Sequence, residues 1–237
     1  FRRNGNNFEF VANTPELSYP ARASDISPGG NYLIACSAST ALHRVVLYEI
    51  IDNSIVELRT ISSSDVRAVG FSPSGERYFV AAGARLDIYK REGQTYNMEF
   101  QYIQTGDYGR VSSAAFVSDN SLVLLDGTGY TPRYTLRQLD YNMDTGNWDV
   151  TLSVSTGVSS DKVDWFAEKY ILLSGSRAIW APPADIAHKN TDESPSLYAS
   201  TALLNNAGVF FTRIQGDERA HIGVYRIRTN PQNTQSY

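Results

Sequence analysis

The sequence predicts an all-β fold built from a repeated unit, and three observations support this prediction. Residues 25–37 (DISPGGNYLIACS) match residues 70–82 (GFSPSGERYFVAA) without a gap, and a third copy follows around Phe116, again 45 residues later. The segments in each copy are short and rich in Val, Ile, Leu, Phe and Tyr, which favours strands. Gly, Pro, Asn, Asp and Ser separate these segments, as is typical of turns. A period of roughly 40 to 50 residues indicates a repeat architecture.

The second copy defines the unit. We predict its strands at 66–71, 77–81, 86–90 and 96–102. Each segment is too short for a stable helix, and none sustains the 3.6-residue period of one. The unit therefore contains four strands.

The remaining copies keep the same order of elements. In the third copy, the segment 136–154 reads as a hairpin whose turn, 144–147 (DTGN), accepts a positive φ. The fourth copy begins near Lys162, and its Gly175 echoes Gly83 two periods earlier. The fifth copy covers 197–214 and 221–227. The fourth is the weakest, because 181–196 is polar and Pro-rich where its last strand is expected.

Four antiparallel strands repeated in this way favour a β-propeller. An open stack would leave a sheet edge exposed at each end, whereas radial repetition around an axis leaves only short, protected edges. We therefore predict an all-β β-propeller of four-stranded antiparallel blades.

The quoted residues also resemble the WD-repeat superfamily. The Ser-Pro-x-Gly turns at 27–30 and 72–75 follow the first strand, as they do in that family, and the third strands contain VVLYE (45–49), LDIYK (86–90), AIWA (178–181) and GVYRI (223–227). The Asp that follows the Trp of the family pattern and its Gly-His pair are absent here, so no subfamily is identified.

The resemblance to propellers implies how the ring closes. We expect one domain over 1–237 with five blades at about 20–60, 65–104, 110–155, 162–196 and 197–228, the last completed by the N-terminal strand 6–12. The sequence begins with Phe1 rather than Met, which is consistent with a processed or trimmed product. A parent with six or seven blades therefore stays open.

Composition excludes several classes of function. The net charge of −4 argues against general nucleic-acid binding, which needs a large positive excess. No apolar run approaches the roughly 18 to 20 residues of a membrane-spanning helix. The single Cys36 lies in an apolar run, so we expect a buried and unreactive thiol. The compartment is left open by these features.

No catalytic residue, metal site or cofactor is predicted. His43 and His221 stand at the starts of third strands in units that would be neighbours in a five-blade ring, so an acid-base or metal pair is one interpretation. Equivalent polar residues at strand ends explain the same pattern, and no carboxylate keeps a fixed spacing to either histidine. The segment 124–133 lacks the lysine and the following helix of a phosphate-binding loop.

An arginine precedes each predicted third strand. Because the connection between the second and third strands opens on the same face of every blade, these residues could surround one mouth of the channel, together with Tyr130 and the turn 105–110. The five are Arg44, Arg85, Arg133, Arg177 and Arg219. Guanidinium groups bind carboxylates and phosphates through forked hydrogen bonds. The alternative is that these side chains cap strands and cover apolar edges.

These observations predict a non-catalytic protein–protein interaction module or a scaffold subunit of a larger assembly. It would bind a protein partner through the loops of one face, and a partner that binds the arginines would be acidic. Two alternatives stay open. One is a propeller enzyme of the hydrolase or lactonase type with its site at the channel mouth, and the other is a carbohydrate-binding propeller.

Overall fold

The computed structural model describes 21 strands and no helix among the residues it covers. Those residues are 2–4, 7–9, 21–38, 43–52, 54–63, 65–106, 108–128, 133–155, 162–166, 170–174, 178–180, 187–188, 197–205, 209–214 and 221–226, with side chains described only between 22 and 155. The contacts divide the chain into two compact units, Phe1–Ser159 and Ser160–Tyr237. No helix that could cross a membrane occurs in the described part of the chain.

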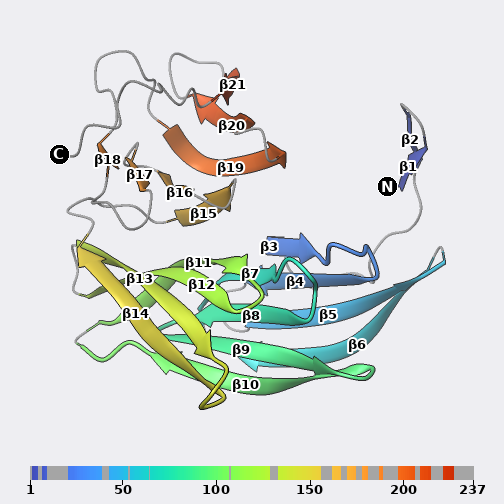
Figure 1. Cartoon of the computed structure of the whole chain (residues 1–237). Helices are drawn as coiled ribbons and strands as arrows, with labels where there is room; N and C mark the ends of the chain where they lie inside the picture. Colours follow the sequence, from blue (N-terminus) through green and yellow to red (C-terminus); the bar gives the residue numbers. More distant parts are fainter. Residues whose placement is uncertain are drawn as a thin grey trace. The chain divides into compact units, whose positions relative to one another are not determined.

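The first unit contains three four-stranded antiparallel sheets (Figure 1). The first sheet consists of β3 (Ala21–Ile26), β4 (Tyr32–Ala38), β5 (His43–Ile51) and β6 (Ser54–Ser63). The second consists of β7 (Val66–Phe71), β8 (Arg77–Ala82), β9 (Arg85–Glu92) and β10 (Thr95–Ile103). The third consists of β11 (Arg110–Ser118), β12 (Ser121–Thr128), β13 (Arg133–Asn142) and β14 (Asn147–Ser155). Within each sheet, every strand pairs with its neighbours in sequence.

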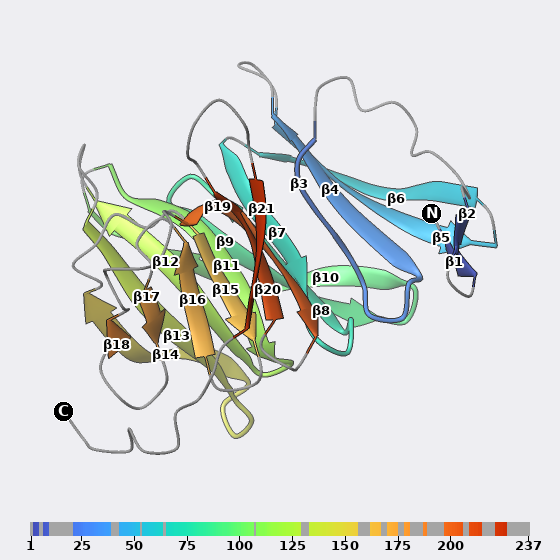
Figure 2. The same ribbon diagram turned by 90° about the horizontal axis from the view of Figure 1, so that it is seen from above.

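The first strands of successive sheets are neighbours. β3 packs against β7, and β7 packs against β11, so the three sheets meet along their first strands (Figure 2). This arrangement is that of propeller blades, and it confirms the predicted fold class. The number of blades stays a prediction.

The second unit contains one four-stranded and one three-stranded sheet in its described residues. The former consists of β15 (Lys162–Phe166), β16 (Tyr170–Ser174), β17 (Ala178–Trp180) and β18 (Ala187–His188). The latter consists of β19 (Leu197–Asn205), β20 (Val209–Ile214) and β21 (His221–Arg226). The two-residue length of β18 agrees with the weak fourth strand expected from its polar, Pro-rich sequence.

The predicted strand positions are close to the observed ones. The first strands of the five sheets β3–β6, β7–β10, β11–β14, β15–β18 and β19–β21 begin within one residue of the predicted positions. They begin at Ala21, Val66, Arg110, Lys162 and Leu197. Gly146 has a φ of 69° in the turn between β13 and β14, as its position in that hairpin requires.

The closure of the last blade by the N-terminal strand stays a prediction. β2 (Asn7–Glu9) pairs with β1 (Arg2–Asn4) as a local hairpin, and the sheet of β19–β21 has three strands. Only two residues separate β1 from β2, and closing so short a connection costs little conformational entropy.

Apolar side chains alternate between two cores. On β8, Tyr78 and Val80 face the first sheet, and Phe79 and Ala81 face the third. All six residues of β8 are buried, which is what a strand covered on both faces requires. Cys36 lies in the first core and is fully buried, so the predicted burial of this thiol is confirmed. Burial also raises its pKa.

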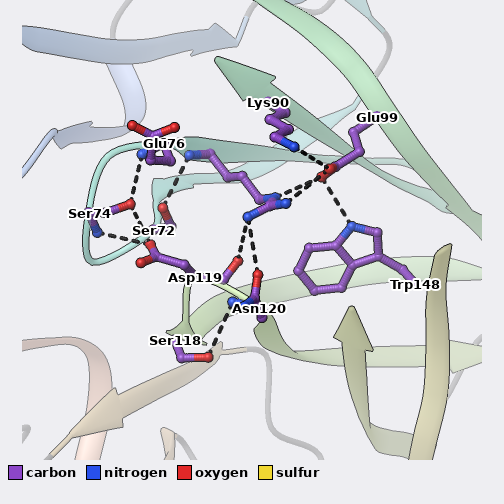
Figure 3. A network of polar contacts seen from close by, with 10 residues as sticks. Ser72, Ser74, Glu76, Lys90, Glu99, Ser118, Asp119, Asn120 and Trp148 are labelled. Carbon is purple, nitrogen blue, oxygen red and sulfur yellow. Dashed lines mark hydrogen bonds and ion pairs between the residues drawn. The ribbon is translucent and has the colours of Figure 1, made fainter. Parts of the chain in front are cut away.

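A buried polar cluster clamps the second sheet to the third at the end that carries the Ser-Pro-x-Gly turn. The Arg77 Nε lies 2.7 Å and the Nη2 3.0 Å from the two carboxylate oxygens of Glu99. The Trp148 Nε1 donates to the same carboxylate at 3.2 Å, and Ser74 donates to Asp119 (Figure 3). Although burial opposes its charge, the hydrogen bonds from Arg77 and Trp148 lower the pKa of Glu99. The clamp holds two neighbouring sheets in a fixed relation.

Candidate functional site

The opposite end of the three sheets in the first unit carries Arg44, Arg85 and Arg133, and we call it the arginine face. It is formed by the connections between second and third strands and by those leading from each fourth strand to the next sheet. Arg85 and Arg133 are the first residues of β9 and β13, and Arg44 is the second residue of β5. These three residues therefore lie at the starts of third strands, and their role in binding stays a prediction.

Several predicted site residues lie outside what the structure describes. His43 and His221 begin β5 and β21, but their side chains, like that of Arg133, are outside the described set. Arg177, Arg219 and Tyr130 lie outside the described residues altogether. The convergence of the five arginines, and the histidine pair, stay predictions. Among the described residues, no group of three His, Cys, Asp or Glu side chains could hold a metal ion.

Arg85 is held in place and yet partly open to solvent. Its Nε lies 3.2 Å from the Asp87 Oδ2, and its Nη2 donates to the Ser63 Oγ at 3.2 Å. Gln101 donates to the same Asp87 carboxylate at 2.8 Å. The side chain of Arg85 remains 42% exposed. Arg85 therefore joins the second sheet to the end of β6 while it presents a cation to solvent.

An exposed apolar side chain lies beside this arginine, and a second one follows in the next connection. Ile103 is the pairing partner of Arg85 across β9 and β10, so both side chains lie on the same face of the sheet. Ile103 is 58% exposed, and Tyr108, in the following connection, is 64% exposed. Tyr108 also has a left-handed φ of 55°, which is uncommon for a bulky residue. The sequence predicted the turn 105–110 for this face. It gave no motif or repeat position that would have identified Ile103 as exposed.

The first strands of the three sheets carry bulges at equivalent positions. The pairing of β3 with β4 skips Arg22, that of β7 with β8 skips Arg67, and that of β11 with β12 skips Ser112. These residues are spaced at the 45-residue repeat. A bulge re-aims the side chain of its extra residue and is over-represented next to functional sites. The repeat spacing was the signal that could have identified Arg22 and Arg67 from sequence.

Both bulged arginines contact a single carboxylate. The Arg67 Nε and Nη2 donate to the Asp65 Oδ2 at 2.9 and 2.6 Å. The Arg22 Nη1 lies 3.5 Å from the Asp65 Oδ1. Side-chain exposures are 39% for Arg22, 25% for Arg67 and 41% for Asp65, so solutes can reach the group. Two cations on one anion leave a positive charge in excess.

The backbone around this group is fixed by hydrogen bonds between connections. Asp65 has a left-handed φ of 52°, and its carbonyl accepts the Gly83 N–H at 3.0 Å. The Gly83 carbonyl accepts the Val111 N–H at 2.7 Å. These bonds join the β6–β7 connection, the β8–β9 turn and the start of β11. Left-handed non-glycine residues concentrate at functional sites, where the surrounding structure holds them.

Unpartnered buried polar atoms gather at the corner of the third sheet. The Ser112 Oγ, the Arg110 Nε and the Asp126 Oδ1 are buried without a hydrogen-bond partner in the described part of the chain. Arg110 and Val111 pair with Gly127 and Asp126, so the three residues occupy adjacent positions of one ladder. Such atoms are rare in folded proteins and call for a specific explanation.

Asp126 also anchors β10 to the third sheet. Its Oδ2 accepts hydrogen bonds from the Tyr102 hydroxyl and, at 2.5 Å, from the Arg137 Nε. Burial, followed by the hydrogen bond to Asp126, raises the pKa of Tyr102, so the phenol stays protonated and donates. This cluster is part of the packing between the second and third sheets.

Comparison with known proteins identifies the fold. No protein-family model matches the sequence, and no curated protein matches it. A candidate 6-phosphogluconolactonase from Bacteroides uniformis superposes with a TM-score of 0.66 at 11% identity, covering 92% of this chain and 71% of its own. A functionally unknown protein from Desulfotomaculum acetoxidans gives 0.66 at 14% identity, covering 90% and 70%. Hydrazine synthase from Kuenenia stuttgartiensis gives 0.63 at 17% identity, covering 85% and 64%. At these identities, the chain shares with them the propeller type of fold.

Proposed function

We propose that this chain is a non-catalytic interaction module, a WD-repeat-like propeller that binds an acidic partner protein through the connections of its arginine face. The observation that carries the proposal is the pairing of Arg85 with the exposed Ile103, which the exposed Tyr108 follows in the connection from β10 to β11. Arginine and tyrosine are among the residue types that dominate binding energy at protein interfaces, and an exposed aliphatic side chain adds apolar area to bury. The exposed Arg44, on the neighbouring sheet, extends the positive charge.

We also propose that residues 1–237 form one domain. The first sheet has a second apolar cluster, Ala35, Val46 and Tyr48, in addition to the core that it shares with the second sheet. On β12, Leu122 and Leu124 belong to the core with the second sheet, so the alternating and fully buried Val123 and Leu125 belong to the other face. A sheet with two apolar faces needs further packing on each side, which supports a domain larger than three sheets.

The test uses affinity capture with matched baits. The wild-type chain and the Ile103→Ser/Tyr108→Asn variant are used on the same extract, and Asn is chosen because it tolerates the left-handed backbone. Met98→Ser serves as the control, because Met98 is 57% exposed on the outer strand β10. A genuine partner is retained by the wild type and the control and lost from the double variant. Its purified form should bind the double variant about 30-fold more weakly, corresponding to roughly 2 kcal/mol for interface anchors. A set of retained proteins identical for all three baits would contradict the proposal.

The similarity in fold to a candidate 6-phosphogluconolactonase favours a second candidate, a hydrolase of the lactonase type. Incubation of the purified chain with 6-phosphogluconolactone in a pH-stat distinguishes the two. Acid release above the spontaneous rate and proportional to protein concentration would support the enzyme. A rate equal to that of buffer leaves the interaction module as the better proposal.

A further inference from the structure

We infer that Arg22 and Arg67 form a binding site for an oxyanionic group, a phosphate or a carboxylate of a small molecule, and that Asp65 occupies this site as an internal competitor. The site lies on the first strands of the first and second sheets and uses none of the residues that carry the proposed protein interface. It does not depend on the proposed partner protein.

The geometry of the pair carries the inference. Two guanidinium groups from neighbouring strands approach the two oxygens of one carboxylate, the Arg67 fork at 2.6–2.9 Å and Arg22 at 3.5 Å. This is how a pair of arginines would hold the oxygens of a bound phosphate or carboxylate. The longer Arg22 distance shows that Asp65 satisfies one arginine well and the other poorly. An added anion with more oxygens or a freer position would engage both.

The repeat supplies an independent observation. Arg22, Arg67 and Ser112 are the extra residues of bulges at the same register of β3, β7 and β11. Ser112 is 6% exposed, and its Oγ has no hydrogen-bond partner among the described residues. A buried hydroxyl without a partner is costly, and here it holds the third of three equivalent positions whose other two are arginines. Arginine and serine side chains both donate hydrogen bonds to oxyanions.

The role of Asp65 gives the site a distinctive signature. If the two arginines only stabilise the fold, removing the Asp65 carboxylate weakens the protein and creates no binding. If they form an anion site, the same change leaves both guanidinium groups uncompensated and strengthens the binding of an added oxyanion. Asn and Gly both accept the left-handed φ of 52° at this position, so two variants are available that preserve the backbone.

The experiment is a calorimetric titration of the full chain with inorganic phosphate and, separately, with acetate at constant ionic strength. We expect Asp65→Asn and Asp65→Gly to bind phosphate, acetate or both on the order of tenfold more tightly than the wild type, the size of one charge-assisted hydrogen bond. Adding Arg67→Gln to Asp65→Asn should remove this gain. Adding Arg91→Gln to Asp65→Asn should preserve the gain. This substitution removes the same charge as Arg67→Gln, but Arg91 lies near the end of β9 that is remote from Arg85.

The two anions separate the ligand classes: tighter binding of phosphate alone indicates a phosphorylated ligand, and tighter binding of acetate alone indicates a carboxylate. Either result supports the site. Thermal melts identify which variants are folded. Folded Asp65 variants that bind neither anion more tightly than the wild type would overturn the inference, as would a gain that persists after Arg67→Gln.

Discussion

The Glu99 carboxylate holds together the clamp between the second and third sheets, and its neutralisation tests the packing of these two blades. Glu99→Gln keeps the shape of the side chain and removes its charge. In the native protein the carboxylate accepts two hydrogen bonds from Arg77 and one from Trp148. The side-chain exposures of Arg77 and Glu99 are 7% and 12%, so water replaces little of what is lost.

The magnitude follows from this burial. Removing one partner of a buried ion pair costs about 3–5 kcal/mol, because the other charge is left uncompensated. Arg77 retains its hydrogen bonds to the Asp119 carbonyl and the Asn120 side chain and its position over the Tyr141 ring. We therefore expect the lower end of the range, about 3 kcal/mol. With a urea slope near 2 kcal/mol/M, the unfolding midpoint falls by about 1.5 M.

The assay is urea unfolding at neutral pH followed by tryptophan fluorescence, since Trp148 contacts the clamp directly. Glu92→Gln is the control, because Glu92 is exposed and its loss should change stability by less than about 0.5 kcal/mol. A Glu99→Gln effect no larger than the control would refute the assigned role of the clamp.

The pH dependence provides a second readout of the same residue. The pKa of Glu99 is lowered from its ordinary value of 4.5 in the folded protein. The stabilisation from its charge is therefore present above that ordinary value and is lost as the pH falls through the lower, folded value. The stability difference between the wild type and Glu99→Gln should shrink in this acidic range. A difference that stays constant down to acidic pH would show that charge is not the cause.

Three further predictions concern the packing. Gly70→Ala should lower stability by about 1–3 kcal/mol in thermal melts, since the added Cβ would lie 2.7 Å from the Phe79 ring; an unchanged melt would contradict this contact. Tyr102→Phe should cost about 1–3 kcal/mol in urea unfolding, because the buried Asp126 loses a donor, and a neutral result would place water there instead. Cys36 should resist a thiol reagent in the native state and react after denaturation, as its burial and raised pKa require; stoichiometric native labelling would contradict the core position.

Much of the fold could be predicted because its signals are local. Strand segments, turns and their 45-residue spacing are written in short stretches, and the second copy appears as β7–β10 with shifts of at most two residues at strand ends. The arginines at third-strand starts were found in the same way, since position relative to a strand is a local property. Whether these arginines converge on one face depends on how the sheets pack against one another, and no local pattern in the sequence encodes that packing.

Local signals are insufficient where two distant segments meet. The sequence 6–12 has strand character, and β2 within it pairs with the nearby β1, while its place in the last blade stays a prediction. The role of Arg22 and Arg67 could not be predicted for a related reason. Their spacing was visible, but the bulges that re-aim them and the carboxylate they share emerge only when β3 and β7 lie side by side.

The amino-acid order alone determined that the chain is a repeated all-β structure, because alternation of apolar residues and turn chemistry act over a few residues at a time. The tertiary structure decided which polar groups contact one another. A bulge of one residue changes the direction of a side chain, and the packing of the sheets decides which side chain it meets. For this protein, the bonds from the Arg77–Glu99 pair to the third sheet and the pair of arginines on Asp65 belong to that second category, since each joins neighbouring sheets whose packing no local pattern encodes.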